Sequence, residues 1–430
     1  MNKTFNIAVV GLGQIGSYLL NELNTKKKDI QNKTGKLINI VAISARNKNK
    51  KRPFKINKKI FYSNPLKIIK EKKIDILFEV IGTSDGISKR IVETALKNEI
   101  HVITPNKALI SKHGDYLSKL AEKNKVNLEF EASVGGGIPI LRTIKEGLAT
   151  NKITKIYGIL NGTCNYILSQ MEETNDSFQN VLKKAQKLGY AEPINPKLDL
   201  NGHDALSKVK ILSSLAFNKK ISNSNNLMEG IENIESKDFK IVDQLNYRIK
   251  LLGITELINN QLFERVHPCL VKKNTYIGNV NGVMNAVILE GNPVGQSVLQ
   301  GEGAGPGPTS SALMSDLLSI LRGNIKYPFG ISNIRRKKIK TYNSNKYSNS
   351  LYLRLEVVDK PGVLAIITNQ LAKFNISVQR LIQIPDHKRT TASIVIITHE
   401  ANELNSKKCL KSFSANKNIL KTPVLIRLFY

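Results

Sequence analysis

The stretch Phe5-Asn-Ile-Ala-Val-Val10-Gly11-Leu-Gly-Gln-Ile-Gly16 decides the fold of the N-terminal part of this chain. A β-rich run ends at Val10, and a G-x-G-x-x-G turn leads directly into a helical pattern. Glycines here allow a tight strand-to-helix turn and let a pyrophosphate approach free N–H groups at the helix N-terminus. Because the motif stands in the first βαβ unit, it predicts a dinucleotide site. The alternative is a glycine-rich turn that holds no ligand.

The first 135 residues continue this alternation of β-rich runs and helical patterns, which indicates an α/β fold with a doubly wound parallel sheet of the Rossmann type. Two lysine-rich stretches, 26–36 and 47–59, are expected to be exposed loops. The predicted strands are 5–10, 37–44, 74–81, 100–104 and 126–131, and the predicted helices are 14–24, 65–72, 86–98 and 107–124.

Two further folding units are expected after residue 135. Residues 136–330 mix strands with longer helices, 331–350 form a polar linker, and 351–430 have the βαββαβ order of a ferredoxin-like unit. In the middle unit we expect strands at 153–160, 262–271, 275–280 and 283–289, and helices at 138–149, 165–172, 177–188, 203–217, 236–258 and 309–322. In the last unit we expect strands at 351–358, 376–384, 391–398 and 423–429, and helices at 363–373 and 400–411.

The composition narrows the class of protein. The chain has 430 residues, 41% of them apolar and 23% charged, which is ordinary for a globular protein of two or three domains. There is no apolar run of membrane-spanning length, and the three cysteines are far apart, so we expect no membrane partner, no disulfide framework and a cytoplasmic location. The net charge of +31 comes mostly from lysines spread along the whole chain. No nucleic-acid-binding motif accompanies them, so the charge favours anionic ligands over nucleic acid.

The end of the second predicted strand indicates which nicotinamide cofactor binds. NAD-binding proteins usually place an acid there, whereas this chain has Ser44-Ala-Arg46 followed by several lysines and Arg52. A guanidinium pairs with a 2′-phosphate in bidentate fashion. NADP(H) is therefore the expected cofactor with Arg46 as its main contact, and NAD(H) is the alternative.

The segment from Glu192 to Lys208 carries three acids within its 17 residues and ends in a lysine. Asp204 and Lys208 are four residues apart on a predicted helix, so their side chains share one face. An acidic pocket beside a lysine suits a substrate with an ammonium group and a reacting oxygen. A surface ion pair is the competing interpretation.

Together, several motifs resemble those of the homoserine dehydrogenases. They are the glycine turn, Ile103-Thr-Pro-Asn-Lys107, Glu131-Ala-Ser-Val-Gly-Gly-Gly-Ile-Pro139, Asn161-Gly-Thr-Cys-Asn-Tyr-Ile-Leu168, the Glu192–Lys208 segment and Gly301-Glu-Gly-Ala-Gly-Pro-Gly-Pro-Thr309. The last 80 residues, with Asp359-Lys-Pro-Gly-Val-Leu364, resemble an ACT domain. The resemblance implies an oxidoreductase that interconverts L-aspartate 4-semialdehyde and L-homoserine with NAD(P)H. Two departures from the family pattern are Glu192-Pro-Ile-Asn-Pro196, which has one extra residue and Asn in place of Asp, and Glu302, where relatives often carry a base.

The resemblance also assigns roles to individual residues. Lys208 and Lys107 match catalytic lysines, which stabilise or protonate the oxygen that gains charge when hydride reaches the aldehyde. Two ammonium groups in one pocket would lower each other's pKa, bringing one toward neutral pH. The remaining matches are substrate-binding Glu192, Asp199, Asp204 and Thr163; cofactor-binding Gly11, Gly13, Gln14, Ile15, Gly16, Arg46, Gly82, Thr83, Lys107, Glu302 and Gly303; and Glu131, Val134, Gly136 and Ile138, which would hold Na⁺ or K⁺ mainly through carbonyl oxygens.

The resemblance implies the following domain roles. Residues 1–135 bind the nucleotide, 136–330 bind substrate and form the dimer, 302–322 return to the nucleotide domain, and 351–430 regulate. Asp359 and Gly362 stand where a threonine effector would bind, and the assembly is expected to be a homodimer or homotetramer. Three other functions stay open at this point: a nucleic-acid-binding protein, a non-catalytic amino-acid sensor, and another NADP-linked enzyme of amino-acid metabolism.

Overall fold

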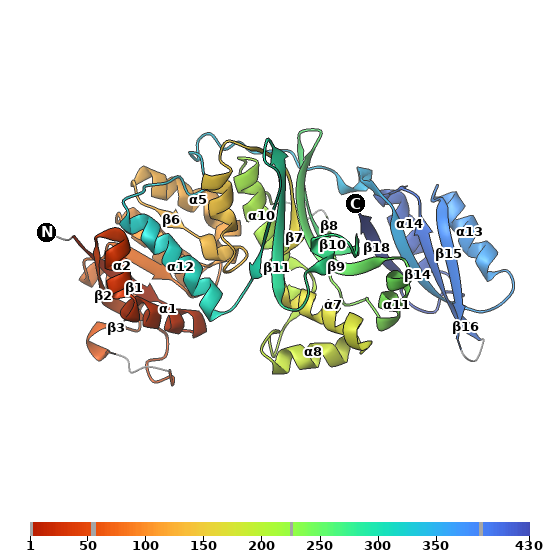
Figure 1. The fold of residues 1–430 in the computed structure, drawn as a ribbon, viewed down its shortest axis with the longest axis horizontal. Helices are drawn as coiled ribbons and strands as arrows, with labels where there is room; N and C mark the ends of the chain where they lie inside the picture. The colour runs from red at the N-terminus through yellow and green to blue at the C-terminus, as the bar shows by residue number, and fades with distance from the viewer. Residues whose placement is uncertain (1–2, 53–56, 224–226, 387–389) are drawn as a thin grey trace.

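The computed structural model describes residues 3–52, 57–223, 227–386 and 390–430. The molecule is elongated, and its N-terminal, middle and C-terminal parts follow one another along the long axis (Figure 1). The N-terminal sheet has the strand order β3-β2-β1-β4-β5-β6, and all its neighbouring strands are parallel. Its strands are β1 (Thr4–Val10), β2 (Leu37–Ser44), β3 (Phe61–Tyr62), β4 (Ile76–Glu79), β5 (His101–Ile103) and β6 (Leu128–Glu129).

This order confirms the doubly wound fold that the alternating pattern predicts. The strand order reverses at β1, and dinucleotides bind beyond the carboxyl ends of the strands at such a switch point. The five predicted strands are present, and only the two-residue β3 was not expected. The predicted helices are present as α1 (Gln14–Thr25), α3 (Pro65–Glu71), α4 (Ile87–Lys97) and α5 (Lys107–Lys123).

The prediction of a loop at 26–36 is wrong, because the segment contains helix α2 (Lys27–Thr34). Its one buried residue, Ile30, anchors the helix to the domain core, while the lysines stay in solvent. Long straight-chain side chains lose little freedom in a helix, so a lysine-rich segment with one apolar anchor can be helical. Gly35 ends the helix in the left-handed conformation. The other lysine-rich stretch lies partly outside the described residues.

The middle part is built on strands β7 (Lys152–Ile159), β9 (Tyr247–Ile258), β10 (Gln261–Lys272), β11 (Met284–Asn292) and β12 (Gly295–Glu302), with β8 (Leu227–Met228) beside β10. The predicted helix 236–258 is wrong in its second half. Helix α11 (Ser236–Gln244) ends, Asn246 has a positive φ of 64°, and the chain becomes the central strand β9. β9 pairs with β7 on one side and β10 on the other, and its apolar run does not distinguish a buried strand from a buried helix.

The predicted strand 275–280 is also wrong, because the chain there forms the short 3₁₀ turn Ile277–Asn279 after a reversal at residues 273–276.

The middle part also contains most of the helices that the sequence predicts for it. The helices are α6 (Ile140–Arg142) with a π turn at Thr143–Gly147, α7 (Gly162–Thr174), α8 (Phe178–Lys187), α9 (Lys197–Leu200), α10 (His203–Ala216) and α12 (Pro306–Leu321).

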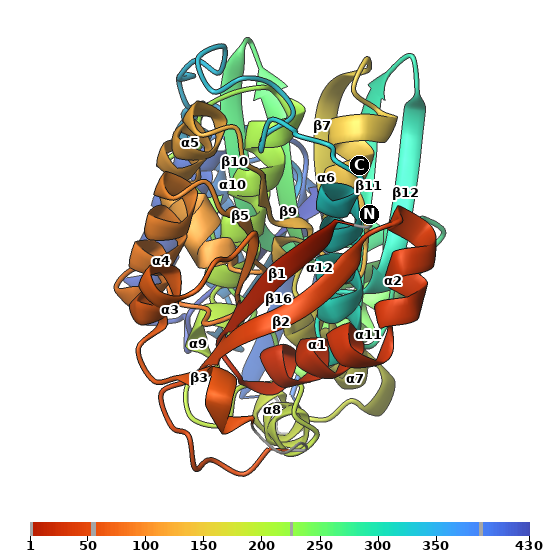
Figure 2. The ribbon, with the colours of Figure 1, turned by 90° about the vertical axis from the view of Figure 1, so that its left-hand side faces the viewer.

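Helix α12 returns to the N-terminal part of the chain. It packs against α1 and the N-terminal sheet, with Leu313 and Leu317 in the same apolar cluster as Leu19 and Leu23 (Figures 1 and 2). The packing places the first turn of α12 close to α1: a Cβ on Gly307 would lie 3.7 Å from the Tyr18 hydroxyl.

The C-terminal part has the predicted βαββαβ order. Its elements are β14 (Leu351–Val358), α13 (Val363–Lys373), β15 (Val378–Pro385), β16 (Thr391–Thr398), α14 (Glu403–Ser414) and β18 (Val424–Phe429), with a small ladder of β13 (Ser348–Asn349) and β17 (Ala401–Asn402). The last strand, β18, pairs in parallel with β10, so one ten-stranded sheet runs through both parts. The two parts are therefore joined by backbone hydrogen bonds as well as by side chains.

The polar segment 331–350 lies against the middle part. Backbone N–H groups of Lys220 and Leu262 donate to the carbonyl oxygens of Lys337 and Lys340 at 3.1 and 2.9 Å. The three cysteines are buried and unpaired. In the parts of the chain that the structure describes, no helix has the length and apolar character needed to cross a bilayer.

Candidate active site

The glycine turn has the geometry of a phosphate-binding turn. Gly11 has a φ of +103°, and a Cβ there would lie 2.4 Å from the Val80 carbonyl oxygen. A Cβ on Gly16 would lie 1.8 Å from the Gly11 oxygen, so both positions require glycine for close packing. Gly13 has nothing within 4 Å of an added Cβ, which leaves open space at the N-terminus of α1. Together with the neighbouring exposed Gln14 and half-buried Ile15, the turn can hold a pyrophosphate.

A second loop, after β4, faces the same switch point. The buried Glu79 carboxylate accepts hydrogen bonds from the N–H groups of Ile81 (2.9 Å) and Gly82 (3.4 Å) and from the Thr104 hydroxyl (2.6 Å). The Asn106 amide donates to the Thr83 carbonyl oxygen at 2.8 Å. Glu79 and Asn106 thus hold the Gly82–Thr83 loop against the start of α5. The sequence reasoning overlooked Glu79, although it is a buried acid at the end of a parallel strand.

Two arginines follow β2 on the exposed side of the glycine turn. Arg46 is exposed and lies two residues after the end of β2. The Arg52 guanidinium donates to the Leu12 carbonyl oxygen at 3.3 Å and to the carbonyl oxygen of Asn47 at 2.9 Å. Arg52 therefore folds the loop back toward the glycine turn, whereas the Arg46 side chain stays available to a ligand.

The two candidate lysines meet at one carboxylate. Lys107 Nζ lies 2.9 Å from Oδ1 of Asp204, and Lys208 Nζ lies 2.7 Å from Oδ2 of the same residue. The pair is formed because α5 and α10 pack side by side with their N-termini at the same end (Figure 1). Lys208 is 8% exposed, while the Lys107 side chain is 42% exposed. Lys208 also donates to the Leu160 carbonyl oxygen at 2.6 Å.

Asn161 connects the acids of this site, a role that sequence reasoning did not assign to it. Its amide nitrogen donates to Asp199 Oδ1 and to Asp204 Oδ2, both at 2.9 Å. Its Oδ1 accepts from the Cys164 N–H at 2.8 Å and caps the N-terminus of α7. The only signal in the sequence was its place in the Asn161-Gly-Thr motif.

The remaining candidate substrate residues lie at the rim of the site. The Thr163 hydroxyl donates to the Tyr190 carbonyl oxygen at 2.5 Å, so it holds the start of the Glu192 segment in place. Glu192 is exposed, and its charge acts on Lys107. The loop with the extra residue, 193–195, is exposed and lies outside the ion-pair cluster.

The acidic surroundings decide the protonation states. Burial acts to raise the pKa of Asp204, but the charges of Lys208 and Lys107 outweigh it and hold that pKa well below its usual range. Burial and the charge of Asp204 raise the pKa of Asp199. The expected mutual lowering is not seen at Lys107. The Asp204 carboxylate raises its pKa above the ordinary value, because an anion lies between the two ammonium groups.

The turn expected to hold a cation is buried between the two lobes. The Glu131 carboxylate accepts from the N–H groups of Leu141 (2.9 Å) and Arg142 (2.8 Å). Val134, Gly136 and Ile138 are buried, and a Cβ on Gly136 would lie 2.6 Å from the Gly303 carbonyl. In the described part of the chain there is no group of three or more His, Cys, Asp or Glu side chains that could hold a metal ion. A cation here would therefore depend on backbone carbonyl oxygens.

The loop after β12 reaches the same junction. The Gly137 N–H donates to the Glu302 carbonyl oxygen at 3.1 Å, and the Glu302 side chain is exposed. Gly303 packs onto Asn285, where an added Cβ would lie 2.0 Å from the amide nitrogen. The structure thus brings Glu302 and Gly303 next to the cation turn, at the start of the helix that packs on α1.

The ACT-like part has a hollow of its own at the β14–α13 turn. This cavity of about 440 Å³ is lined by Asp359, Gly362 and Gln383, among others. The Gln383 amide donates to Asp359 at 3.0 Å, and Gly362 has a φ of +84° at the N-cap of α13. Both candidate effector residues therefore line one cavity, beside α13, which lies far along the molecule from α5 and α10 (Figure 1).

Comparison with known proteins agrees with this arrangement. Family models match residues 11–131 (homoserine dehydrogenase, NAD binding domain), 139–318 (homoserine dehydrogenase) and 351–414 (ACT domain). The chain is 37% identical to a homoserine dehydrogenase of Neisseria gonorrhoeae, with 99% of each chain covered, and 37% identical to one of Helicobacter pylori, with 100% of each covered.

A solved structure extends the similarity to three dimensions. The crystal structure of a homoserine dehydrogenase from Thiobacillus denitrificans matches with a TM-score of 0.90 and 34% identity, covering 99% of this chain and 98% of that one. The matches extend over the nucleotide-binding, middle and ACT parts in a single order. The chain therefore belongs to the homoserine dehydrogenases, NAD(P)-dependent oxidoreductases of amino-acid biosynthesis that interconvert L-aspartate 4-semialdehyde and L-homoserine, and it carries a C-terminal ACT domain.

Proposed function

We propose that Lys208 is the general acid of aldehyde reduction and the general base of homoserine oxidation. An ammonium group has three N–H donors. Two of those of Lys208 are used by the Leu160 carbonyl oxygen and Asp204, which leaves one for a substrate oxygen. Its burial in the candidate site is the observation that carries the proposal, because a lysine that served only as a surface ion pair would be exposed.

The chemistry needs a proton at one oxygen atom. The bound nicotinamide supplies or accepts the hydride. As the aldehyde carbon is reduced, its oxygen gains negative charge, and Lys208 donates a proton to it to complete the hydroxyl group. In oxidation Lys208 accepts that proton. Lys107, which is half exposed on the opposite side of Asp204, stabilises the oxygen by charge, since its raised pKa keeps it protonated.

We assign the binding of the substrate's amino group to the acidic side of the site. Asp204 is paired with two lysines, whereas the Asp199 carboxylate accepts a hydrogen bond from the neutral Asn161 amide. Burial raises the pKa of Asp199, so a bound ammonium group would stabilise its ionised form. Glu192 at the rim adds a second carboxylate, while Asp204 mainly orients the two lysines. Thr163 supports the loop that carries Glu192.

We propose NADP(H) as the preferred cofactor and Na⁺ or K⁺ as a structural cation. The residues fit a dinucleotide, since the turn at Gly13 and the loop at Gly82 both leave open space for it. The exposed Arg46 guanidinium can pair with a 2′-phosphate, and no acid replaces it after β2. The cation is assigned to the carbonyl oxygens of Glu131, Val134, Gly136 and Ile138.

We further propose that threonine binds the cavity at Asp359 and Gly362, and that protomers pair through the middle sheet. An amino acid offers an ammonium group to the Asp359 carboxylate and a carboxylate to N–H groups at the start of α13.

The pairing of protomers is supported by the edge of the middle sheet. The sheet ends at β12, an edge strand whose side chains are exposed or half exposed. Flat activity across threonine concentrations would contradict the first of these proposals, and a monomer in light scattering would contradict the second.

One assay tests the substrate assignment and the cofactor preference together. The rate of nicotinamide reduction is measured at 340 nm with homoserine and either NADP⁺ or NAD⁺, with serine and threonine as control substrates. We expect turnover with homoserine alone and a higher kcat/KM with NADP⁺. Equal rates with both cofactors would contradict the role of Arg46, and oxidation of serine at the same rate would contradict the substrate assignment.

A further inference from the structure

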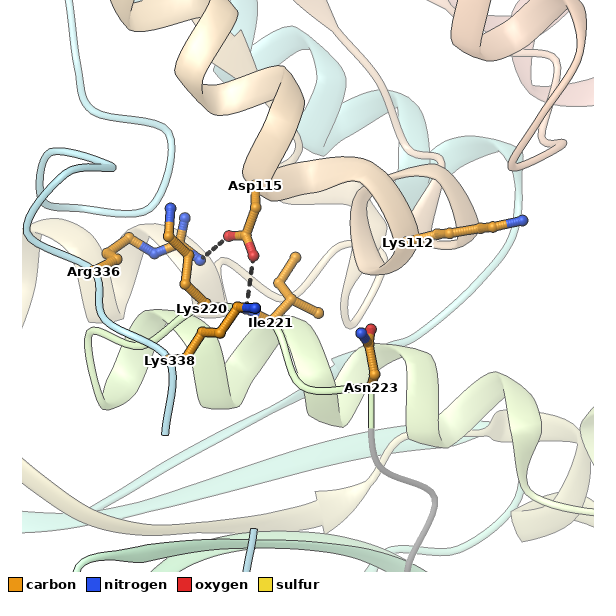
Figure 3. Close-up of a pocket in the computed structure, with 7 residues that line it drawn as sticks. All are labelled: Lys112, Asp115, Lys220, Ile221, Asn223, Arg336 and Lys338. Carbon is orange, nitrogen blue, oxygen red and sulfur yellow. Dashed lines mark hydrogen bonds and ion pairs between the residues drawn. The ribbon is translucent and has the colours of Figure 1, made fainter. Parts of the chain in front are cut away.

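A basic pocket lies where three distant segments of the chain meet. It is a hollow of about 490 Å³ between helix α5, the chain after α10 and the segment that leads to the C-terminal domain (Figure 3). We use the name basic pocket for the cavity lined by Asp115, Lys220, Ile221, Arg336 and Lys338. Neither the catalytic residues nor the cavity at Asp359 contribute to it.

The cations of the basic pocket outnumber its acids. The Asp115 carboxylate is 2.8 Å from the Arg336 guanidinium and accepts from the Ile221 N–H at 3.1 Å (Figure 3). Among the residues that the structure describes, Lys220 and Lys338 have no carboxylate within ion-pair distance; Lys220 donates to the amide oxygen of Asn333. Among these lining residues three cations stand against one carboxylate, an excess of two positive charges; Glu122, which does not line the hollow, also acts on Lys220 and Arg336. Lys112, at the rim, pairs with Asp85 and points away.

Arg336 is the buried member of this group. It is 2% exposed, its guanidinium stacks on the Phe329 ring at 3.8 Å, and one of its terminal nitrogens has no hydrogen-bond partner in the described part of the chain. A buried N–H group without a partner is costly, and anions are the partners that a guanidinium binds best. Burial lowers the pKa of Lys220, with a smaller contribution from the charge of Arg336, while Asp115 and Glu122 oppose this, so nearby negative charge would stabilise the Lys220 ammonium.

The pocket is separated from Lys208 by most of the length of helix α10, and Asp115 lies about 12 Å along α5 from Lys107 at 1.5 Å per residue. Asp204 and Lys208 lie in the first turns of α10, while Lys220 follows its C-terminus, about 20 Å along the axis at 1.5 Å per residue. At that end the Arg336 guanidinium donates to the Lys219 carbonyl oxygen at 3.0 Å and to the Ser214 hydroxyl. An anion in the pocket would therefore contact the chain that follows α10 and the segment that leads to the C-terminal domain.

We propose that the basic pocket binds a small phosphate dianion, either inorganic phosphate or a phosphate monoester, through Lys220, Lys338 and Arg336. Two surplus positive charges match a dianion, and the cavity has room for an organic group beside a phosphate. The binding is independent of the catalytic role of Lys208 and of the cofactor preference.

The test is a titration of the full-length protein by calorimetry at constant ionic strength, with chloride as the balancing anion. The probes are inorganic phosphate and glycerol 2-phosphate, which separate the two sources of the dianion. The variant Lys220→Gln/Lys338→Gln removes two lysines of the pocket. Its matched control, Lys337→Gln/Lys340→Gln, removes two exposed lysines of the same segment that do not line the hollow and has the same net charge.

We expect the pocket variant to bind phosphate at least about tenfold more weakly than the unaltered protein, since each lost ammonium removes a charge-assisted hydrogen bond. The control variant and Arg46→Gln are expected to bind normally. Three results would overturn the proposal: no binding to the unaltered protein, equal loss in the control variant, which indicates diffuse attraction to a basic protein, or loss in Arg46→Gln alone, which places the phosphate in the cofactor site. Circular dichroism of each variant at the temperature of the titration excludes unfolding as the cause of weaker phosphate binding.

Discussion

Lys107 and Lys208 lie on different helices, 101 positions apart in the sequence, and bind opposite oxygens of the single carboxylate of Asp204. The carboxylate lies between the two cations and offsets their mutual repulsion. It also makes Asp204 the residue on which the positions of both ammonium groups depend. The predictions below follow from this cluster and from the contacts that connect it to the rest of the protein.

Replacing Lys208 by Ala is expected to lower kcat at least about a hundredfold, since a general acid or base contributes that much or more. Because Lys208 is buried, thermal unfolding is measured alongside the rate of NADPH oxidation. The control is Lys187→Ala, which removes an exposed lysine at the end of α8. A Lys208→Ala enzyme with more than a tenth of normal kcat would exclude the proposed role.

Asp204→Asn is expected to shift the pH–rate profile as well as the rate. The carboxylate is the first cause of the raised pKa of Lys107, and burial acts in the opposite direction. Without the charge, the pKa of Lys107 falls, so the alkaline limb of kcat/KM moves to lower pH. The measurement is kcat/KM between pH 6 and pH 10. Loss of rate with an unmoved alkaline limb would mean that Lys107 does not contribute.

Asp199→Asn is expected to lose activity and gain stability. Burial raises the folded-state pKa of Asp199 above its unfolded value, so ionisation favours the unfolded chain as pH rises above about 3.9. The amide removes this cost at neutral pH and makes no difference in acid, where both states are protonated. Melting temperatures of the two proteins should therefore separate as pH rises from 4 to 8. A constant difference between the two melting temperatures across this pH range would show that the pKa of Asp199 is not raised in the folded protein.

Arg46→Gln is expected to raise the KM for NADPH about tenfold and leave the KM for NADH almost unchanged. The variant lacks the guanidinium, so NADPH loses a charge-assisted hydrogen bond to its 2′-phosphate, a group that NADH does not have. Lys28→Gln, on the exposed face of α2, controls for the loss of one positive charge. If both cofactors weaken equally in Arg46→Gln, the residue does not discriminate between them.

Arg427→Met is expected to destabilise the junction between the middle and C-terminal parts by about 3–5 kcal/mol, the usual cost of breaking a buried ion pair. Arg427 of β18 binds Glu229 at 2.7 Å and 2.8 Å and Glu403 at 2.7 Å, and Glu403 is 2% exposed. The measurement is the urea dependence of tyrosine fluorescence. Recovery of part of the loss in Arg427→Met/Glu403→Leu would show that the unpaired carboxylate is the cause.

Much of the fold could be predicted because its signals are local. The alternation of apolar runs and helical patterns located five of the six N-terminal strands and the order of the C-terminal unit. The failures occurred where local pattern is ambiguous. The sequence of β9 is predicted to be helical because a strand buried on both faces shows no alternation of apolar and polar residues. The sequence of α2 is predicted to be a loop because Ile30 is its one buried residue, which gives too weak a helical periodicity.

The site divides in the same way. By itself the sequence determined the glycine turn, where Gly11 and Gly16 leave no room for a side chain, and the common helix face of Asp204 and Lys208. Only the tertiary structure decided that Lys107 and Lys208 share the Asp204 carboxylate, that Asn161 connects the acids, and that the pKa of Lys107 is raised. The physical reason is the distance along the sequence between the interacting residues. Backbone conformation and i,i+4 spacing are set by neighbouring residues, whereas ion pairs and pKa values depend on distances that packing of α5 against α10 creates.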